Sequence, residues 1–446
     1  MAGSKGTFLK QPARRAMDGV ASRVAGDLEP RFGDVLQRLD RLEAAVGRAT
    51  SPSALFPGFH ELLHALRTAE LTEMPKGAEV VLSAGCSGRW YFDWVEQAYG
   101  PVRRHIGIER FEERPVDLPA GVEWIATSVA DLSPVPDASV DLVFSGQNIE
   151  HLFGDDLVDF LCESARVVRP GGHLVLDSPH REIARLLVWS MNQHTIELTP
   201  REAAELVELA GFSVSSLRGI WLAREPGGGP LYPLDPMGND FSATEIVRRI
   251  QLASRHPDDS FVWWLEAVRR EGPPDREGLR RRHAEIFSAA WPERANRLTS
   301  PIGAVSEEEG HRVARVSPGQ AGYLMIGPYM PLAAAHYTVT FRLRATSPVA
   351  DAAAVAAVEV VADGREPVIA ERLVTGRELP LDEWVAITVP FDVAELRWTG
   401  QFRVRAVGVA GLDTRLEVDL DDRGSPVWPS PLAGPRANAG AQGVRG

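Results

Sequence analysis

The residues best suited to chemistry are a short glycine-containing turn and an acidic residue that follows it. The segment Val80–Arg89 reads VVLSAGCSGR, an apolar run that ends in small residues. Gly85 and Gly88 let the backbone pass close to a ligand, and the free N–H groups at the start of a following helix suit an anionic or polar group. Glu109 ends the next apolar run, about twenty residues on, where an acidic side chain can accept both hydroxyls of a ribose. These features predict a nucleotide-containing cofactor, and on their own they also fit a nicotinamide-dependent oxidoreductase.

Two histidines are candidate general bases. His151 follows Glu150, just after the apolar run Val140–Ser145, and His194 precedes a predicted helix at Pro200. An imidazole titrates near neutral pH, which suits proton removal from a substrate. The competing interpretation gives His151 a structural hydrogen bond at a helix start and makes His194 an ordinary loop residue.

Three further motifs follow the glycine turn in order. They are Asp137–Ser145 (DASVDLVFS), Asn148–Leu152 (NIEHL) and Ala165–Leu176 (ARVVRPGGHLVL). With the turn, this run resembles the class I S-adenosylmethionine-dependent methyltransferases, most closely the broad small-molecule group with EHL and RPGG motifs. The resemblance covers residues 76–220, and it implies an enzyme that uses S-adenosyl-L-methionine.

The resemblance also implies where the cofactor would lie. The turn from Gly85 through Cys86 to Gly88 would hold its methionine end, and Glu109 its ribose. The other residues implied in cofactor binding are Ser83, at the end of the first strand, Ser128, Val129 and Asp131, near the adenine, and Ser145 and Gln147, facing the sulfonium and the acceptor. Ser83 and Ser128 stand where the family usually or often has acidic residues, and a hydroxyl accepts fewer hydrogen bonds and carries no charge.

A metal ion is weighed at the Glu150–His151 pair, because some relatives bind a divalent ion with such a pair. No third ligand is evident from the sequence. We therefore assign no metal-binding residues at this point.

The elements that must position these residues alternate between strand and helix. Over residues 54–224, this alternation with short connections predicts a parallel sheet covered on both faces, a Rossmann-like, doubly wound α/β fold. The predicted strands are Glu79–Ala84, His105–Glu109, Val122–Ala126, Val140–Ser145, His173–Asp177 and Phe212–Leu217, and the helices include Trp90–Gln97, Leu157–Val168 and Pro200–Ala210.

A lid or linker is predicted over residues 225–299. It begins with a Gly/Pro-rich loop and continues with helices at Ser242–Ser254 and at about Arg276–Ala290. A further helix is expected to start at Asp258 and to carry Trp263 and Trp264, at most one of which would face an acceptor.

The pattern changes to alternating strands over residues 300–421, which predicts an all-β sandwich or jelly roll. The predicted strands are His336–Ala345, Val355–Val361, Pro367–Leu373, Trp384–Phe391, Gln401–Val407 and Arg415–Leu420. Arg342, Arg344, Arg403 and Arg405 fall on faces that should point away from the core. If those strands pair, they would form a basic stripe, for which a solvated face is the simpler interpretation.

The ends of the chain have different compositions. Residues 1–27 are basic and predicted to be disordered, as is the tail 422–446. Between Leu28 and Val46 apolar residues alternate at spacings of three and four, which predicts an amphipathic helix over 28–50. That helix would either pack on the next domain or form a coiled coil, and we expect a homo-oligomer.

Composition excludes several classes of protein. Asp+Glu outnumber Lys+Arg by 61 to 48, giving a net charge of -13, so binding to a nucleic-acid backbone is not expected. Two cysteines exclude a disulfide scaffold and fit a reducing compartment. No apolar run approaches the ~20 residues that span a bilayer. We therefore predict a cytoplasmic protein without a membrane span.

The function predicted from the sequence is methyl transfer to a sugar hydroxyl of a glycan or carrier-linked saccharide. The β-domain and the predicted oligomerising helix favour a polymeric or carrier-linked acceptor. The alternatives are methylation of a natural-product small molecule and a non-catalytic scaffold built on a degenerate methyltransferase domain.

Overall fold

The computed structural model describes residues 57–187, 189, 191, 193–234, 243–362 and 368–421. The predicted helix 28–50 and the predicted disordered segments 1–27 and 422–446 lie outside the described residues. The described chain divides into two compact units. The first contains the residues up to Ile149 with Leu161–Trp189 and Glu197–Pro274, and the second contains Glu150–Phe160, Ser190–Ile196 and the residues from Asp275 onward.

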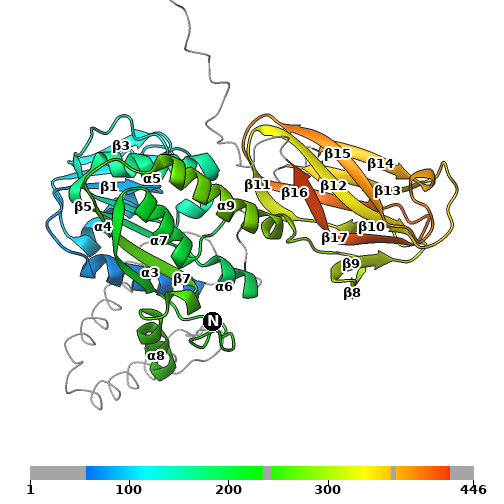
Figure 1. Ribbon diagram of the computed structural model, residues 1–446, viewed down its shortest axis with the longest axis horizontal. Helices are drawn as coiled ribbons and strands as arrows, with labels where there is room; N and C mark the ends of the chain where they lie inside the picture. Colours follow the sequence, from blue (N-terminus) through cyan, green and yellow to red (C-terminus); the bar gives the residue numbers. More distant parts are fainter. Residues whose placement is uncertain are drawn as a thin grey trace, which may run out of the picture. The chain divides into compact units, whose positions relative to one another are not determined.

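The first unit is built on a seven-stranded sheet with the order β3-β2-β1-β4-β5-β7-β6 (Figure 1). The strands β3, β2, β1, β4 and β5 are parallel, and β7 is antiparallel to both of its neighbours. This is the predicted Rossmann-like sheet. Its strands are β1 (Val80–Ala84), β2 (Arg104–Glu109), β3 (Val122–Ala126), β4 (Val140–Gly146), β5 (Val168–Pro179), β6 (Phe212–Gly219) and β7 (Val262–Arg269).

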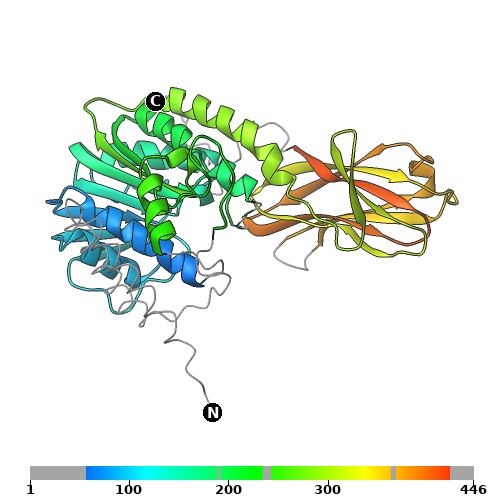
Figure 2. The ribbon, with the colours of Figure 1, turned by 90° about the horizontal axis from the view of Figure 1, so that it is seen from below.

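Helices cover both faces of this sheet. Figure 2 shows α3 and α4 on one face and α5 and α7 on the other. Apolar residues of α3 and α4, such as Phe59 and Phe92, share a buried cluster with Val81 and Phe144 of the sheet. The helical segments of this part of the chain are α3 (Pro57–Glu73), α4 (Arg89–Tyr99), η1 (Ile149–His151), α5 (Gly154–Val167), α6 (Arg181–Leu186), α7 (Pro200–Leu209), α8 (Ala243–Ala253) and η2 (Pro257–Asp259).

The start of α7 shows how local sequence sets an element. The Thr199 side chain accepts from the Glu202 backbone N–H, and the Glu202 carboxylate accepts from the Thr199 N–H, a reciprocal capping box. Pro200 occupies the first turn, where its missing N–H is not needed. The predicted helix at Pro200 is therefore confirmed.

The predicted helix carrying Trp263 and Trp264 is wrong, and so is its role in a lid. This segment is β7, which inserts between β5 and β6. Both tryptophans are fully buried, and the Trp263 indole N–H donates to the Leu198 carbonyl. A strand covered on both faces reads as a continuous apolar run, which periodicity alone cannot distinguish from a buried helix.

The second unit contains a sandwich of two antiparallel sheets (Figure 1). One sheet has the order β10-β16-β13-β14, with β11 also paired to β16, and the other has the order β15-β12-β17-β9-β8. The bounds are α9 (Arg276–Ala295), β8 (Ala304–Glu308), β9 (His311–Val316), β10 (Gly322–Met325), β11 (Pro328–Leu332), β12 (Ala335–Ala345), β13 (Ala354–Val361), β14 (Val368–Thr375), η3 (Gly376–Glu378), β15 (Val385–Val393), β16 (Arg397–Ala406) and β17 (Leu412–Asp421).

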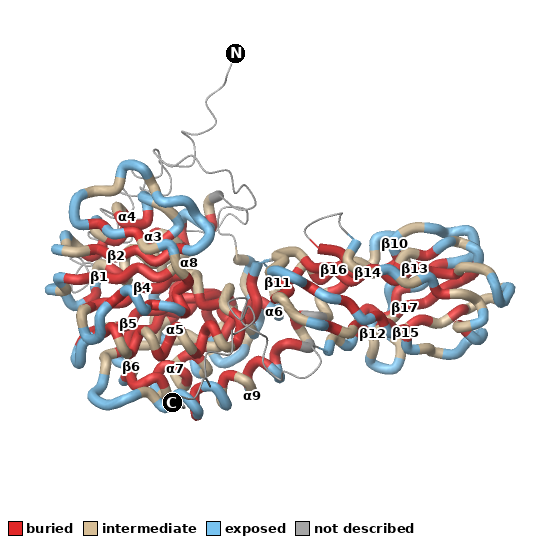
Figure 3. The backbone as a smooth tube through the Cα atoms, turned by 90° about the horizontal axis from the view of Figure 1, so that it is seen from above, coloured by how far each residue is buried: buried red, intermediate tan, exposed pale blue. Residues whose placement is uncertain are grey.

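Alternating side chains form the core of this sandwich. Tyr337, Val339, Phe341 and Leu343 of β12 are all buried, and the residues between them are not, as the alternation predicted. Figure 3 shows the same red, buried core in the strands of both units. The six predicted strands are confirmed, whereas β8 to β11 were not predicted, because they are short, with four to six residues each.

The second unit also takes in two segments from the middle of the chain. Phe153 of α5 and Ile196 belong to the same buried cluster as Phe287 of α9 and the sandwich core. The Arg280 guanidinium pairs with the Asp155 carboxylate at 3.6 Å. Both histidines singled out from the sequence lie in these segments, so the core of the second unit holds them in place.

No helix among the described residues is both long and apolar enough to cross a membrane.

Two buried histidines and one partly buried histidine predict a pH-dependent stability. Burial lowers the pKa of His64, His180 and His283 to about 4. Between about pH 6.5 and pH 4 the unfolded chain therefore binds more protons than the folded chain. Over this range each histidine lowers the free energy of unfolding by about 1 kcal/mol for every unit by which the pH falls.

His283→Leu should remove one of these contributions. Its Nδ1 has no hydrogen-bond partner among the described residues, so an apolar replacement loses little. We expect the free energy of unfolding, measured in urea at pH 7, 5.5 and 4.5, to fall less steeply in this variant than in the parent. An unchanged slope would show that His283 is protonated in the folded protein.

Candidate functional site

The carboxyl edge of the parallel sheet gathers most of the predicted site residues. The strand order reverses between β1 and β4, and open α/β sheets bind ligands where this reversal occurs. Gly85 follows β1, Glu109 ends β2, Ser128 follows β3 and Gln147 follows β4. The topology therefore brings together four segments that are separated in the sequence.

The turn after β1 needs glycine at its first position. Gly85 has a φ of +78°, and a Cβ atom there would lie 2.5 Å from Asn148 Oδ1. The amides of Gly85 and Cys86 both donate to the Ile108 carbonyl, which joins the turn to β2. The side chain of Asn148 thus borders this turn from the loop after β4.

Glu109 has one carboxylate oxygen committed to the protein. Its Oε1 accepts from the backbone N–H groups of Arg110, Phe111 and Glu112 at 2.8, 2.7 and 3.3 Å. The side chain is largely buried. Among the described residues no hydrogen bond to Oε2 is found, so this oxygen can accept from a ligand hydroxyl.

The predicted adenine loop folds back on itself. Ser128 Oγ accepts from the Ala130 N–H at 3.2 Å, and Asp131 Oδ1 accepts from the Ser133 N–H at 3.1 Å. Ser128 and Val129 are buried, and Asp131 is exposed. Two buried residues and one acidic rim residue therefore border the end of β3.

The loop after β4 is held by a buried carboxylate. Gln147 adopts a left-handed backbone conformation with a φ of 53°. Its Nε2 donates to Asp177 Oδ1 at 2.6 Å, and Arg67 binds both oxygens of Asp177 at 2.8 and 3.0 Å. Ser145, fully buried, accepts from Asn148 Nδ2 at 3.0 Å. The Gln147 amide is therefore directed to Asp177.

Ser83 and Cys86 have internal partners. The Ser83 hydroxyl lies 2.8 Å from His105 Nε2, and both residues are buried. The Cys86 thiol donates to the Ile108 carbonyl at 3.6 Å. Burial, together with the nearby Glu109 carboxylate, raises the pKa of the Cys86 thiol, so it remains protonated and unreactive.

The two candidate bases lie against each other. The rings of His151 and His194 are 4.7 Å apart and nearly perpendicular, and His194 Nε2 lies 3.9 Å from Glu150 Oε1. One ligand atom from each of Glu150, His151 and His194 can be chosen so that all three lie within 4.8 Å of one another. His194, which is 44 residues from Glu150, is thus the third side chain that the sequence analysis did not place beside the Glu150–His151 pair.

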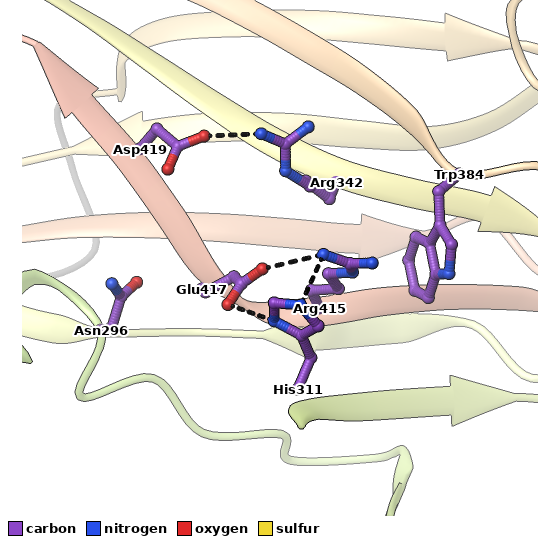
Figure 4. A pocket seen from close by; sticks show the side chains of 7 residues that line it. All are labelled: Asn296, His311, Arg342, Trp384, Arg415, Glu417 and Asp419. Carbon is purple, nitrogen blue, oxygen red and sulfur yellow. Dashed lines mark hydrogen bonds and ion pairs between the residues drawn. The ribbon is translucent and has the colours of Figure 1, made fainter. Parts of the chain in front are cut away.

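A recess lies on the outer face of the sandwich (Figure 4). Its volume is about 380 Å³. His311 Nδ1 lies 2.9 Å from Glu417 Oε2, and Arg342 donates to Asp419 Oδ2 at 2.9 Å. The lining residues are Asn296, His311, Arg342, Trp384, Arg415, Glu417 and Asp419. Two guanidinium groups, an imidazole and two carboxylates line it together with one indole ring.

The four arginines weighed as a basic stripe on the sandwich do not form one. Arg342 and Arg344 lie on β12, whereas Arg403 and Arg405 lie on β16 of the other sheet. Arg403 is also buried. The remaining three pair with carboxylates: Arg342 with Asp419, Arg344 with Glu308 and Asp413, and Arg405 with Glu359 and Glu371.

The sequence analysis missed three residues near the carboxyl edge of the parallel sheet: Arg67, Asn148 and Asp177. Asn148 lies inside the NIEHL motif, and Asp177 ends a predicted strand, so both carried a positional signal. Arg67 carried none, because its partner is 110 residues away in the sequence.

Comparison with known proteins gives consistent matches. A family model described as a methyltransferase domain matches residues 82–176. The chain is 30% identical over 250 residues to a probable S-adenosylmethionine-dependent methyltransferase of Mycolicibacterium smegmatis. The matched region spans 54% of this chain and 90% of that protein. It is 32% identical over 154 residues to a probable S-adenosylmethionine-dependent methyltransferase of Mycobacterium tuberculosis, spanning 32% of this chain and 52% of that protein.

Solved structures of low sequence identity also match. A SAM-dependent methyltransferase from Archaeoglobus fulgidus is 19% identical, covers 48% of this chain and 96% of its own, and has a TM-score of 0.35. The 1,6-didemethyltoxoflavin-N1-methyltransferase of Burkholderia thailandensis, with bound 1,6-didemethyltoxoflavin and S-adenosylhomocysteine, is 17% identical over 54% of this chain and 90% of its own, with a TM-score of 0.30.

Replacing Gly85 by alanine should destabilise the protein more than the same change at Gly171. Both glycines have nearly equal φ, +78° and +79°, but a Cβ at Gly171 meets no atom within 4 Å. The backbone strain of about 1–2 kcal/mol is therefore shared. Gly85→Ala must also displace Asn148, which adds about 1–3 kcal/mol.

The measurement is the free energy of unfolding of both variants in urea. Equal losses would show that Asn148 does not border the turn as described.

Proposed function

The chain belongs to the class I S-adenosylmethionine-dependent methyltransferases, and from this we propose that it methylates a hydroxyl group of a saccharide, free or carrier-linked. The methyl donor is S-adenosyl-L-methionine. The acceptor is the part that is proposed, and the recess on the outer face of the sandwich is the observation that carries it.

For the cofactor, we propose the carboxyl edge of the parallel sheet. The ribose hydroxyls would donate to Glu109 Oε2, since Oε1 already accepts three backbone N–H groups. The methionine end would lie over the turn from Gly85 through Cys86 to Gly88, with Ser145 and Gln147 beside the sulfonium. Ser128, Val129 and Asp131 would border the adenine, and the Ser83 hydroxyl would support the turn through His105.

The reaction itself requires little covalent chemistry from the protein. The acceptor oxygen attacks the methyl carbon, the C–O bond forms as the C–S bond breaks, and the bonding pair stays on sulfur. The products are the methyl ether and S-adenosylhomocysteine, and the acceptor proton leaves. Holding the two reactants in line and removing that proton are the tasks left to the protein. For proton removal we propose the cluster of Glu150, His151 and His194.

The lining of the outer-face recess favours a neutral, hydroxyl-rich ligand. Arg342 and Arg415 are balanced by Glu417 and Asp419, so the recess has no strong preference for an acidic or a basic ligand. Sugar hydroxyls both donate and accept, and therefore pair with carboxylates and guanidinium groups together. The indole of Trp384 offers an apolar edge beside them.

Methylation of a natural-product small molecule is the second proposal. The cofactor chemistry would be the same, but the outer-face recess would then have no part in acceptor binding. The two proposals differ in whether changes in that recess alter the KM for the acceptor.

Glu109→Gln should weaken S-adenosylmethionine binding about 10- to 150-fold, the equivalent of about 1.5–3 kcal/mol for a hydrogen bond to a charged group. Glutamine keeps an oxygen for the three backbone N–H groups, so the loop is preserved. Its amide nitrogen cannot accept from a ribose hydroxyl. Calorimetric titration with S-adenosylmethionine and S-adenosylhomocysteine measures the change.

Glu112→Gln is the matched control, because this exposed neighbour also loses one charge. It should bind the cofactor as the parent does. A change below threefold in Glu109→Gln would remove Glu109 from the cofactor site.

Asp419→Ala should raise the KM for a saccharide acceptor about tenfold, because a charge-assisted hydrogen bond to a hydroxyl is lost. Release of S-adenosylhomocysteine is measured against a panel of neutral oligosaccharides and non-sugar hydroxyl compounds. The affinity for S-adenosylmethionine should not change.

Asp392→Ala serves as the control. This carboxylate is similarly exposed on the same sheet and pairs with His336, but it does not line the recess. Equal KM values for the two variants, or turnover with non-sugar compounds alone, would overturn the saccharide proposal.

A further inference from the structure

We propose that the indole of Trp90 is a stacking platform for the sugar ring that receives the methyl group. The inference rests on the proposed function and deepens it, because it names the side chain against which the acceptor ring would lie. Trp90 is the second residue of α4 and comes two residues after Gly88, at the end of the glycine turn. It belongs to the same compact unit as that turn.

The Trp90 indole is held in one orientation. Its Nε1–H donates to the Ser87 carbonyl at 2.7 Å, so the ring is tied to the turn itself. Trp94, one helical turn further on, stacks on it with 6.2 Å between ring centroids and 26° between planes. Tyr91 contacts it edge-on at 5.5 Å. A large side chain that is ordered in advance loses little conformational entropy when a ligand packs on it.

Despite these contacts, much of the Trp90 indole is open to solvent. Trp90 is 49% exposed, whereas Trp94 and Tyr91 are buried. The open surface is the part that is turned away from those two rings. Single exposed apolar residues are common on protein surfaces, but this one is fixed beside the turn proposed to hold the methionine end of the cofactor. It therefore offers an apolar surface to an acceptor that approaches the cofactor from this side.

The aromatic wall formed by Trp90, Trp94 and His64 has no net charge. The His64 ring of α3 lies 6.0 Å from that of Trp90 and 4.6 Å from that of Trp94. Burial, together with the Arg67 guanidinium, lowers the pKa of His64 to about 4, so its imidazole is neutral at pH 7. The charge of Arg67 is balanced by Asp177, which it binds through both carboxylate oxygens. The wall therefore favours a neutral ligand over a charged one.

The same contacts lead from the platform to the loop after β4. The Arg67 guanidinium lies 5.1 Å from the centroid of the Trp94 ring. Arg67 and Gln147 both donate to Asp177, and Gln147 is proposed to lie beside the sulfonium. A sugar ring stacked on Trp90 would therefore lie on the side of the site from which a hydroxyl can approach the methyl group.

A sugar ring fits this surface chemically. One face of a pyranose presents C–H groups, which pack on an aromatic ring, and its hydroxyls point outward from the rim. Asp93 is three residues from Trp90 and is thus its neighbour on the helix surface. The Asp93 carboxylate lies 3.5 Å from Arg89 Nε, and both side chains are partly exposed. Beside the indole, a carboxylate can accept from the sugar hydroxyls and a guanidinium can donate to them.

The experiment compares three variants of the full chain. Trp90→Ala removes the platform, and Trp90→Phe keeps an aromatic ring but loses the N–H that binds Ser87. Tyr323→Ala, which removes an exposed aromatic ring on β10, is the control. Release of S-adenosylhomocysteine gives kcat and KM with neutral oligosaccharides of glucose, galactose and mannose, and with simple phenols as flat non-sugar acceptors. Calorimetry gives the affinity for S-adenosylmethionine, and unfolding in urea shows whether each variant is folded.

With a saccharide that the parent methylates, Trp90→Ala should raise the KM about 5- to 30-fold, because stacking and apolar contact are lost. Trp90→Phe should raise it less than about threefold, since a ring remains. Tyr323→Ala should leave the KM unchanged. The affinity for S-adenosylmethionine should be that of the parent in all three variants.

The indole N–H of Trp90 gives a second measurement, which reports on binding directly. In ¹⁵N-labelled protein, its signal is the indole signal that is absent from the spectrum of Trp90→Phe. This signal should shift when the methylated saccharide is added to the complex with S-adenosylhomocysteine. The same addition should not shift it when glycerol replaces the saccharide.

The proposal is overturned, and the proposed function is not, if a saccharide is methylated with the parent's KM by Trp90→Ala. It is also overturned if both Trp90 variants lose affinity for S-adenosylmethionine in step with the rise in KM, because Trp90 then acts only by holding the turn. If no saccharide is methylated, the saccharide acceptor and the platform are overturned together.

Discussion

The candidate site depends on the buried carboxylate of Asp177. It lies near the end of β5 and is inaccessible to solvent. Two nitrogens of the Arg67 guanidinium, Nε and Nη2, and the Gln147 amide donate hydrogen bonds to it. An unpaired charge at such a position would cost several kcal/mol, so the three side chains hold one another in place. They tie α3, β5 and the loop after β4 together. That loop carries Asn148 against the Gly85 turn and leads within a few residues to Glu150.

This loop also connects two parts of the chain that fold with different cores. Up to Ile149 the chain belongs to the sheet unit, and from Glu150 to Phe160 it belongs to the unit that contains the sandwich. Phe153 and Ile196 pack in the sandwich-side core, and Arg294 of α9 binds the loop of His194. The β-rich region therefore supports the histidine cluster as well as carrying its own recess.

The outer face of the sandwich shows how pairing changes the meaning of charge. When each strand is considered by itself, the alternation of residues suggests that four arginines could form one basic stripe. In the structure they are divided between two sheets, and the three that are not buried each pair with a carboxylate. What remains around Trp384 is a recess of balanced charge, which suits hydroxyl groups better than an anionic polymer.

The amino-acid sequence by itself determined the two fold classes, most strands and helices, and the order of the glycine turn, Glu109 and the NIEHL and RPGG motifs. These depend on local periodicity, on caps such as Thr199 and on glycines such as Gly85, which neighbouring residues specify. The tertiary structure alone decided that the Val262–Leu265 run is part of a strand between β5 and β6, that Arg67 binds Asp177 and that His194 meets Glu150 and His151. Such contacts join residues tens of positions apart through burial and charge pairing, and no local pattern encodes the partner of a buried side chain.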